Sequence, residues 1–558
     1  MNTMLAQEIQ KFLEGEMAED NATLEYYSRD ASLFDIRPAV VAFPKHSGDV
    51  KNLVKFMASH KKDDPTLSLS ARSAGTDMSG GPLTESIVMD FTRHMNSIKE
   101  VGDRIITMEG AAMGYAVAEP GVYYRDFELE TLKRGYLLPS YPASRNLCAI
   151  GGMVANDSGG EKSLIYGKTH HYVTALKVVF TDGEEYAVKP MNAEELKKKI
   201  AENTFESELY RKVRELLEKN YDTVKNAKPD VSKNSAGYNI WDVWDRNTFD
   251  LTKLLVGSQG TLGVVTEATF KLISVKEKPC SGMLVVFLND LKKIADIVNA
   301  VLPYEPSSFE SFDDHTLRLA MKFLWGFVKI LAKNPFSLVL AFLPEFWMVV
   351  TKGMPKLVMM IEFEERTKEE VEKKIMELEA KLKSLGVKTR VALTKEAAAK
   401  YWAIRRESFN LLRQKVKGMQ TAPFIDDIIV KPEYLPEFLP KLYAIGEKYQ
   451  LLYTIAGHVG DGNFHVIPLM RLGEASERAK IKPAMDEVYD LVLKYKGSIT
   501  AEHNDGLIRS PYLEQMFGAE VYKIFQEIKN IFDPQNIFNP GKKVNANMDY
   551  ALKHIKRS

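Results

Sequence analysis

The chain has 558 residues, with 75 Lys plus Arg against 75 Asp plus Glu, so its formal net charge at pH 7 is zero. Without an excess of positive charge, nucleic acid is not expected as a partner. An apolar fraction of 45% and an aromatic fraction of 10% exclude a disordered chain. At about 150 residues per domain, the length predicts two to four domains.

The cysteine content and the N-terminus indicate the compartment. Cys148 and Cys280 are too few for a four-thiolate cluster or a disulfide framework, which fits a reducing environment. The first twenty residues carry acidic side chains where a secretory signal needs a basic start and an apolar run. We therefore expect a cytoplasmic protein.

Short apolar runs alternate with helical stretches along most of the chain. A lead helix is predicted over 5–18, within an N-terminal segment of residues 1–35. Strand-like runs, ended by Gly, Pro or Asn turn signals, occupy 40–44, 67–71, 87–91, 106–110, 284–288 and 356–363. Further elements are helices over 49–60 and 368–386 and a hairpin over 173–188. The pattern predicts an α+β fold.

Residues 317–350 depart from this alternation. Their first half carries only four charged side chains, Arg318, Lys322, Lys329 and Lys333. At ~100° per residue these fall within an arc of roughly 60° on a helix. The second half is apolar, but Pro344 and Glu345 make it too short to span a bilayer. We expect a hydrophobic helical insertion that docks on the membrane surface, with a pair of core helices or an oligomer interface as the alternative.

The densest glycine signal is the run Ala-Arg-Ser-Ala-Gly-Thr-Asp-Met-Ser-Gly-Gly at 71–81, directly after a predicted strand. Glycines and small hydroxyl residues allow backbone N–H groups to converge on an anion, which favours phosphate binding. The run fits neither the dinucleotide-binding nor the P-loop pattern. Taken alone, such a run is more often a tight turn.

Other blocks accompany this loop. Pro-Ser-Tyr-Pro-Ala-Ser stands at 139–144, Ile-Gly-Gly-Met-Val-Ala-Asn-Asp-Ser-Gly-Gly at 150–160, and Leu-Val-Gly-Ser-Gln-Gly-Thr-Leu-Gly at 255–263. In this order and at these spacings, the blocks resemble the FAD-binding domain of the vanillyl-alcohol-oxidase/p-cresol-methylhydroxylase superfamily. The resemblance covers about residues 36–275.

The resemblance implies an FAD that lies extended between two subdomains, with its isoalloxazine ring facing a second domain. The cofactor-binding residues that it implies are Arg72, Ser73, Ala74, Gly75, Thr76, Ser79, Gly80, Pro142, Ser144, Gly151, Gly152, Asn156, Ser158, Gly160, Gly260, Val265 and Asn539. Members with a covalent flavin usually carry His in the first loop, where this chain has Thr76, so we expect noncovalent FAD. Cys148 is expected to be a small buried residue.

A second constellation begins with His458 and His465, which enclose the run Val-Gly-Asp-Gly-Asn-Phe. Two histidines seven residues apart would point to opposite faces of a regular strand, but Gly460 and Gly462 allow the chain to bend. With Glu502, they form a two-His, one-carboxylate set that suits a zinc-, manganese- or iron-type divalent ion. Without further context, a His pair is more often structural.

These motifs resemble the C-terminal domain of the FAD-linked 2-hydroxy-acid dehydrogenases, such as the D-lactate, glycolate and D-2-hydroxyglutarate dehydrogenases. Carried over residue by residue, the resemblance makes His458, His465 and Glu502 metal ligands and His503 the catalytic base. Where the family often has Gly after the Glu-His pair, this chain has Asn504.

The resemblance also divides the chain. It implies an FAD-binding domain of two subdomains over 36–275 and an α+β substrate (cap) domain over 276–525. The run Ile-Phe-Asp-Pro-Gln-Asn-Ile-Phe-Asn-Pro-Gly-Lys at 531–542 looks like the family's C-terminal signature. It lies in a segment, 526–558, that is expected to return to the FAD-binding domain.

Oxidation of a 2-hydroxy acid removes a hydroxyl proton and a C2 hydride. A divalent metal lowers the pKa of the alcohol, a histidine accepts the proton, and the flavin takes the hydride. Arg405, in Trp-Ala-Ile-Arg-Arg-Glu, is expected to bind the substrate carboxylate, with a surface salt bridge as the alternative. Phe409 and Ile467 are apolar where relatives acting on dicarboxylates carry polar groups, which favours a lactate-like monocarboxylate.

The sequence therefore predicts an FAD-dependent dehydrogenase of a D-2-hydroxy acid, peripherally attached to the inner face of the cell membrane, that passes electrons to a quinone or another carrier. A homodimer is left open. An ether-lipid synthase of the same superfamily and a noncatalytic, membrane-docked flavin-binding protein are the alternatives.

Overall fold

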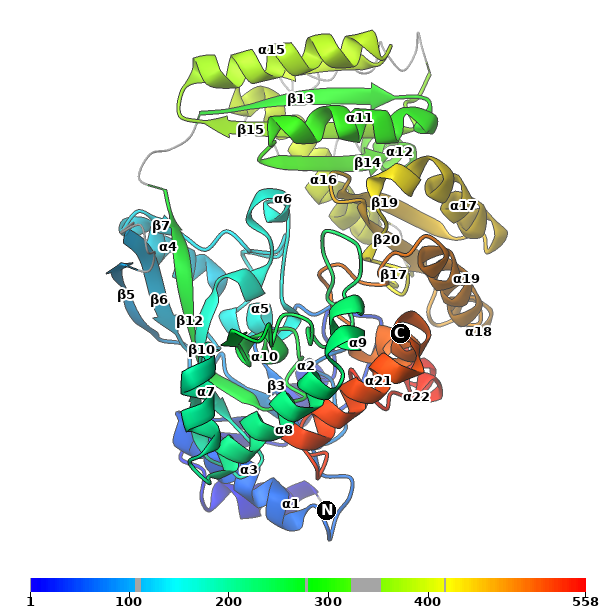
Figure 1. Ribbon diagram of the computed structural model, residues 1–558. Coiled ribbons are helices and arrows are strands. Elements are labelled where there is room, and N and C mark those ends of the chain that lie inside the picture. Colours follow the sequence, from blue (N-terminus) through cyan, green and yellow to red (C-terminus); the bar gives the residue numbers. More distant parts are fainter. Residues whose placement is uncertain (1, 106–111, 276–279, 323–352, 416–417, 558) are drawn as a thin grey trace.

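The computed structural model describes residues 2–105, 112–275, 280–322, 353–415 and 418–557. Two of the three larger sheets lie with their helices in the lower part of the molecule in Figure 1, and the third forms the upper part. A small sheet pairs β10 (Met191–Asn192) with β11 (Thr248–Phe249). The mixture of parallel and antiparallel strands with helices confirms the predicted α+β fold.

The first sheet carries the glycine-rich loop that follows β3. Its strand order is β1 (Glu16–Ala18), β2 (Val40–Phe43), β4 (Ile87–Asp90) and β3 (Leu69–Arg72). Strands β2, β3 and β4 are parallel, and α3 (Ser47–His60) connects β2 to β3 across one face. The apolar side of α3 packs on these strands through Val50, Leu53, Val54 and Met57, which are all fully buried. The strands and the helix predicted here are confirmed.

The N-terminal segment differs from the prediction. Helix α1 spans Asn2–Gln10, and residues 16–18 form β1 in place of the last turn of the predicted helix over 5–18. Strand β1 pairs antiparallel with β2, so it covers the edge of the first sheet. At Gly15, a Cβ would lie 2.0 Å from the carbonyl oxygen of Phe43, which is why only glycine permits this close approach.

The second sheet is antiparallel and forms the other half of the domain expected to bind FAD, residues 36–275, which is called the FAD-binding region below. Its strands are β5 (Ile98–Ile105), β6 (Ala112–Ala118), β12 (Val264–Ser274), β8 (Val173–Val179) and β9 (Glu185–Val188), in that order. Strands β8 and β9 confirm the predicted hairpin, and Gly183 takes a φ of +73° in its turn. The strand predicted over 106–110 lies outside the described residues. Helices α4 (Tyr124–Lys133) and α5 (Ile150–Asn156) share a core with this sheet.

The third sheet belongs to the cap region. Its strand order is β16 (Lys388–Ala392), β13 (Cys280–Leu288), β15 (Leu357–Glu365), β14 (Ser308–Asp313), β19 (Leu452–His458), β20 (Asn463–Met470) and β17 (Gln420–Thr421). Side chains alternate between two cores. On β13, Leu284 and Val286 pack toward α15 (Lys368–Ser384), whereas Met283 and Val285 pack toward α16 (Lys395–Lys415). Figure 1 shows α15 along the outer face of this sheet.

The C-terminal part of the chain packs on the FAD-binding region. Helix α21 (Leu513–Phe532) lies beside α8 (Phe205–Lys219) in Figure 1, and its residues from Val521 onward join the core of the second sheet. The return to this region therefore begins before residue 526. Beyond the helix, Leu69 of β3 donates to the carbonyl of Ile537 at 2.7 Å, and Asn539 donates back to the carbonyl of Leu69 at 2.9 Å.

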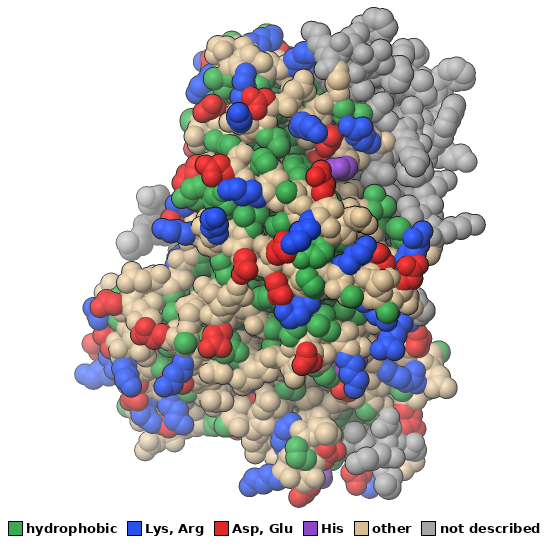
Figure 2. All heavy atoms as spheres, turned by 90° about the vertical axis from the view of Figure 1, so that its right-hand side faces the viewer, with side chains coloured by type: hydrophobic (Ala, Val, Ile, Leu, Met, Phe, Trp, Pro, Cys, Tyr) green, Lys and Arg blue, Asp and Glu red, His purple; other side chains and the backbone are tan. Residues whose placement is uncertain are grey.

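Most of the predicted insertion, residues 323–350, lies outside the described residues. Its described start is the end of α12 (Asp314–Lys322), where Arg318 pairs with Asp314 at 3.4 Å. Across the described residues, no helix is both long and apolar enough to cross a membrane. On the face drawn in Figure 2, positive and negative side chains are interspersed, in keeping with the zero net charge.

Candidate active site

The two histidines of the predicted motif lie on neighbouring strands and face the same side. Strands β19 and β20 form a hairpin in which His465 is opposite Ala456 and His458 is opposite Asn463. The turn needs Gly462, because its φ is +74° and a Cβ would lie 1.9 Å from the carbonyl oxygen of Val430. The hairpin brings the two imidazole rings to within 5.3 Å, measured between their centroids.

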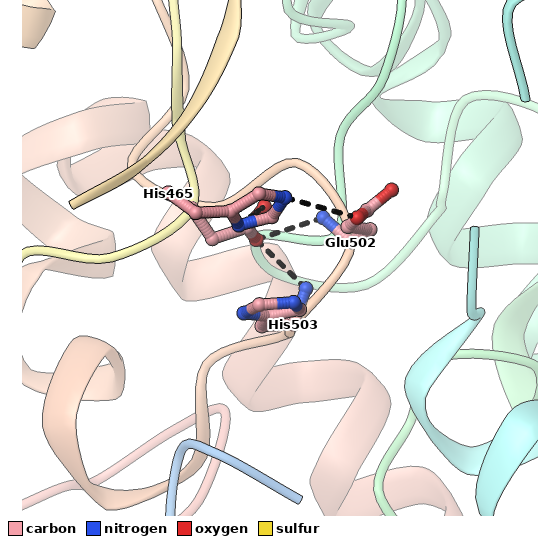
Figure 3. A group of neighbouring side chains, drawn as sticks. His465, Glu502 and His503 are labelled. Atoms are coloured by element: carbon pink, nitrogen blue, oxygen red, sulfur yellow. Dashed lines mark hydrogen bonds and ion pairs between the residues drawn. The ribbon is translucent and has the colours of Figure 1, made fainter. Parts of the chain in front are cut away.

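Glu502 and His503 reach the same place from the loop that follows α19 (Ile481–Lys494). Their backbone N–H groups donate to Oδ2 of Asp427 at 2.8 and 2.7 Å, which fixes the loop against the cap sheet. Figure 3 shows His465, Glu502 and His503 pointing toward one another. The next residue, Asn504, has a φ of +68°, a conformation that favours Gly or Asn, which explains the departure from the family pattern.

The expected metal ligands are brought together. Nε2 of His458 and Nε2 of His465 lie 3.1 and 3.4 Å from Oε1 of Glu502. In a tetrahedral zinc site with bonds of ~2.0–2.1 Å, neighbouring ligand atoms are ~3.3 Å apart. Each imidazole Nε2 therefore lies from Oε1 of Glu502 at about the separation of two neighbouring zinc ligands.

A second grouping of donor atoms overlaps with this one. Asp427, His465, Glu502 and His503 also have donor atoms within 4.8 Å of one another. However, Oδ2 of Asp427 accepts hydrogen bonds from two backbone N–H groups and, at 2.6 Å, from Thr500, while its Oδ1 accepts one from Asn463. Both oxygens of this carboxylate therefore already accept hydrogen bonds.

In each of the three imidazole rings, Nδ1 contacts a buried carboxylate. Nδ1 of His458 lies 2.5 Å from Glu310, and Nδ1 of His465 and of His503 lie 3.2 and 2.6 Å from Asp426. A hydrogen on Nδ1 that is donated to a carboxylate leaves Nε2 unprotonated and available. Each ring is thus oriented to present Nε2 to the centre of the site.

The site favours positive charge. The carboxylates of Glu310, Asp426, Asp427, Asp461 and Glu502 are opposed by three permanent cations, Lys233, Arg405 and Arg509. Burial opposes protonation of His465, but its hydrogen bonds with Asp426 and Glu502 outweigh burial and raise its pKa to about 10. The pKa values of His458 and His503 are also raised, because nearby carboxylates outweigh their burial. The buried carboxylates thus stabilise positive charge on the three imidazole rings.

A cavity of about 430 Å³ runs from these histidines to the glycine-rich loops. Thirteen residues expected to bind the cofactor line it: Arg72, Ser73, Ala74, Gly75, Thr76, Pro142, Ser144, Gly151, Gly152, Asn156, Ser158, Gly260 and Val265. Asn156 is the last residue of α5, and Ser158 lies just beyond it, so neither belongs to a strand. Gly151 leaves no space for a side chain, because a Cβ would lie 2.6 Å from Pro120 and Ser73.

The other four expected residues, Ser79, Gly80, Gly160 and Asn539, are not part of the cavity wall. Asn539 instead donates to the carbonyl groups of Gly81 and Gln259 at 2.9 and 2.7 Å, and so ties two cavity loops together. The backbone N–H groups of Ser79 and Gly81 donate to the carboxylate of Asp77, so they are not free for a phosphate. An anion would have to use the earlier part of the loop.

Arg72 offers a test of whether the cavity fits an anionic cofactor. Its side chain is buried, and its guanidinium donates to the backbone carbonyl groups of Tyr27 and Arg29. Across the described residues, no carboxylate lies within ion-pair distance of it. A buried cation beside a glycine-rich loop suits a pyrophosphate, since a buried charge requires a partner.

Arg405 and Ile467 also line the cavity, at the end where the histidines lie. The Nε of Arg405 donates to Oε2 of Glu310 at 3.1 Å, so the alternative of a surface salt bridge was wrong. Thr454, on β19 opposite Ile467, is 5% exposed, and its hydroxyl makes no hydrogen bond within the described part of the chain. The side chain of Phe409 lies outside the described residues.

Sequence reasoning missed Glu310, Asp426, Asp427 and Lys233. The acidic pair stands in Phe-Ile-Asp-Asp-Ile-Ile-Val at 424–430, where two carboxylates interrupt an apolar run. Such an interruption signals a buried functional group. The ammonium group of Lys233 lies 3.1 Å from Asp461 and 3.4 Å from Glu502, and these carboxylates outweigh burial and raise its pKa.

Two domain families match the chain. Residues 38–189 match the family described as FAD binding domain, and residues 281–543 match FAD linked oxidases, C-terminal domain. The D-2-hydroxyglutarate dehydrogenase of Pseudomonas putida is 28% identical over 540 residues, which are 95% of this chain but 50% of that protein. The chain thus spans about half the length of this relative.

Other similarities extend over whole proteins. The D-lactate dehydrogenase of Archaeoglobus fulgidus is 26% identical over 528 residues, covering 92% of this chain and 96% of that protein. The crystal structure of p-cresol methylhydroxylase with substrate bound superposes with a TM-score of 0.67 at 16% identity, over 98% of this chain and 97% of that one, and shows the shared fold. The chain belongs to the FAD-linked oxidases, with the fold of the vanillyl-alcohol-oxidase/p-cresol-methylhydroxylase superfamily.

Proposed function

We propose that this protein is an FAD-dependent dehydrogenase that oxidises a D-2-hydroxy acid to the 2-oxo acid. The observation that carries the proposal is that the same cavity is lined both by the glycine-rich loops and by His458, His465, Glu502 and His503. A flavin on the loops would meet a substrate held at the histidines. The names of the relatives, which include D-2-hydroxyglutarate and D-lactate dehydrogenases, support this class of substrate.

FAD would be held noncovalently by the loop of residues 72–78, by 142–144 and by α5, with Arg72 beside its pyrophosphate. When bound, the flavin supplies the acceptor for a hydride. Thr76 cannot provide the linkage of a covalent flavin. Cys148 also lines the cavity, but its burial raises its pKa to about 12 and keeps the thiol protonated and unreactive.

The divalent ion, with zinc as the first choice and manganese or iron as alternatives, would be held by His458, His465 and Glu502. The distances of 3.1 and 3.4 Å from Oε1 of Glu502 to Nε2 of His458 and of His465 support this part of the proposal. A bound ion would lower the pKa of the substrate hydroxyl and orient it. Lys233 would keep Glu502 ionised and in place from the opposite oxygen.

His503 would be the catalytic base. Nδ1 of His503 would donate a hydrogen bond to Asp426, which lies 2.6 Å away. Nε2 is then the atom that would accept the hydroxyl proton. Arg405 would bind the substrate carboxylate from helix α16. These groups lie on separate elements of the cap region, and their fixed positions orient the substrate before reaction.

The substrate side chain would extend over Ala456 toward Thr454 and Ile467, which line the cavity beyond the histidines. A methyl group or another uncharged substituent suits these surroundings, so a lactate-like monocarboxylate is favoured.

The test is an anaerobic screen of D-2-hydroxy acids that follows the flavin absorbance near ~450 nm. Bleaching by a lactate-like acid, with release of the 2-oxo acid, supports the proposal. An ether-lipid synthase shows no net reduction with any hydroxy acid, and a flavin-binding protein without catalysis shows none with any substrate. Absence of bleaching across the screen therefore rejects the dehydrogenase.

Transfer of electrons to a quinone and docking on the inner membrane face are proposed for the same enzyme, since the insertion 317–350 combines a cationic stripe with aromatic side chains. Deletion of 317–350 should release the protein from anionic liposomes and reduce its quinone reductase activity, while reduction of a soluble dye survives. If the intact protein does not bind such liposomes, the proposal of membrane docking is wrong. Size-exclusion chromatography tests separately whether the protein forms a homodimer.

A further inference from the structure

Glu310 is a buried carboxylate that the predicted motifs do not include. It lies on β14, the strand next to β19, and is 1% exposed. Its Oε1 accepts from Nδ1 of His458 at 2.5 Å, and its Oε2 accepts from Nε of Arg405 at 3.1 Å. One carboxylate thus joins a proposed metal ligand to the proposed anchor of the substrate carboxylate.

The two partners explain why a charge is stable at this position. Burial favours the neutral acid, but a donor faces each of its oxygens: Nδ1 of His458 and the permanently charged guanidinium of Arg405. The group therefore stays ionised and acts as an acceptor at both oxygens. A buried carboxylate without partners would be strongly destabilising.

For His458, the contact determines which nitrogen is free. With a hydrogen on Nδ1 donated to Glu310, Nε2 carries the lone pair and faces Oε1 of Glu502 at 3.1 Å. The other tautomer would place a hydrogen on Nε2 and prevent it from binding a cation. Outer carboxylates of this kind typically contribute 10–100-fold to metal affinity.

For Arg405, the contact determines which nitrogen atoms of the guanidinium are available to a substrate. Nε is engaged by Glu310, the only side chain with which Arg405 pairs within the described residues. The two terminal amino groups are left to form the parallel pair of hydrogen bonds that a carboxylate accepts. Loss of Glu310 would leave the long side chain free to rotate.

We infer that Glu310 is a positioning residue that couples the metal site to the substrate-carboxylate site by orienting His458 and Arg405 together. The inference rests on the proposed function, because it takes the roles of these two residues from it. The inference adds Glu310 to the residues of the proposed site. It also predicts that the affinity for the ion and the affinity for the substrate carboxylate fall together when this one side chain changes.

The experiment compares Glu310→Ala and Glu310→Gln with the wild type, all loaded with FAD. Zn²⁺ affinity is measured on chelator-stripped protein by competition with a chromophoric chelator, without turnover. Carboxylate affinity is measured at saturating Zn²⁺ from the change in flavin absorbance on adding a 2-oxo acid. Glu310→Ala should weaken Zn²⁺ binding by about 10–100-fold and carboxylate binding by about 10-fold or more.

Glu310→Gln keeps the size but can accept at one oxygen only. It should lose either the correct tautomer of His458 or the hold on Arg405, so at least one of the two affinities should fall by about 10-fold or more. Glu362→Gln is the matched control: Glu362 lies on the neighbouring strand β15 and does not line the cavity. Flavin content and the thermal midpoint check that each variant folds.

Wild-type Zn²⁺ affinity in both Glu310 variants, or wild-type carboxylate affinity in Glu310→Ala, overturns the inference while leaving the proposed function intact. A wild-type protein that binds no Zn²⁺ removes the metal from the proposed function, and the coupling fails with it. An equal loss in Glu362→Gln would show that any carboxylate of this sheet matters, which also overturns the inference.

Discussion

His465 and His503 stack with their ring centroids 4.8 Å apart and their planes at 20°, and the two rings share one carboxylate, that of Asp426. The proposed metal ligand and the proposed base are therefore oriented by the same side chain. Because Asp426 and Asp427 are adjacent and Asp427 holds the backbone of Glu502 and His503, this short acidic segment organises most of the proposed chemistry.

The first prediction concerns the base. His503→Ala should slow flavin reduction by about 10²–10⁴-fold, the usual contribution of a general base, while FAD stays bound. Stopped-flow measurement of flavin bleaching under anaerobic conditions gives the rate. His315→Ala, which removes an exposed histidine from the same region, is the control and should leave the rate unchanged. A wild-type rate in His503→Ala would remove this residue from the mechanism.

The second prediction concerns the metal. Glu502→Gln should lose the divalent ion but retain FAD, because an amide is a weaker metal ligand than a carboxylate. The change also removes a carboxylate that neutralises Lys233, so the charge of Lys233 would repel a cation more strongly. Metal analysis together with the flavin absorbance of the purified variant measures both. Chelation of the wild type should likewise abolish turnover with FAD retained. A fully active wild-type preparation without stoichiometric metal would contradict the metal site.

The third prediction concerns the flavin. Arg72→Ala should lower the ratio of flavin to protein by about 10-fold or more, since a charge-assisted contact with phosphate would be lost. Arg145→Ala is the control, because Arg145 pairs with Glu128 and does not line the cavity. Acid precipitation of the wild type should release the flavin into the supernatant. Colour that remains in the pellet would show a covalent link.

The fourth prediction concerns the substrate. Catalytic efficiency should be at least about 10²-fold higher for D-lactate-like acids than for 2-hydroxyglutarate, because burying an unpaired carboxylate near Ile467 costs several kcal/mol. Ile467→Asn should narrow this difference by offering the second carboxylate a donor. Steady-state kinetics with both acids measures the ratio. A wild-type preference for 2-hydroxyglutarate or malate would reject the monocarboxylate.

The fifth prediction concerns stability and pH. Burial raises the pKa of Glu362 to about 7, above its usual value of 4.5, so the unfolded state releases this proton first. The contribution of Glu362 to the stability of the folded state therefore falls as the pH rises from about 4.5 to 7. Glu362→Gln removes this loss. The thermal midpoint of the variant, measured relative to that of the wild type, should therefore rise by ~1–3 °C as the pH increases from 5 to 8. Parallel curves for the two proteins would contradict the raised pKa.

The glycine blocks could be identified from the sequence because their requirements are local. Gly462 and Gly151 are needed where the backbone or a side chain approaches too closely for a Cβ, a requirement that glycine alone meets. The short apolar runs likewise predicted β2 and β13, which are buried on both faces, and the one-sided apolar pattern predicted α3 and α15, which each bury one side.

Other features depended on partners distant in the sequence. The predicted lead helix over 5–18 ends early because residues 16–18 pair with β2, and the helical pattern contains no sign of that partner. Glu310 meets His458 only because β14 lies beside β19, and Lys233 meets Glu502 across 269 residues of chain. A single charged residue in a strand looks the same whether it faces solvent or a buried cation.

The sequence by itself therefore identified the family and the glycine-rich loops that line the cavity. It also identified His458, His465, Glu502 and His503 as candidate site residues, because all of these follow from short motifs with fixed backbone geometry. Only the tertiary structure decided which side chains surround them. Strand order and the loop after α19 place Glu310, Asp426 and Lys233 against the histidines and Glu502, and burial then requires these charges to pair.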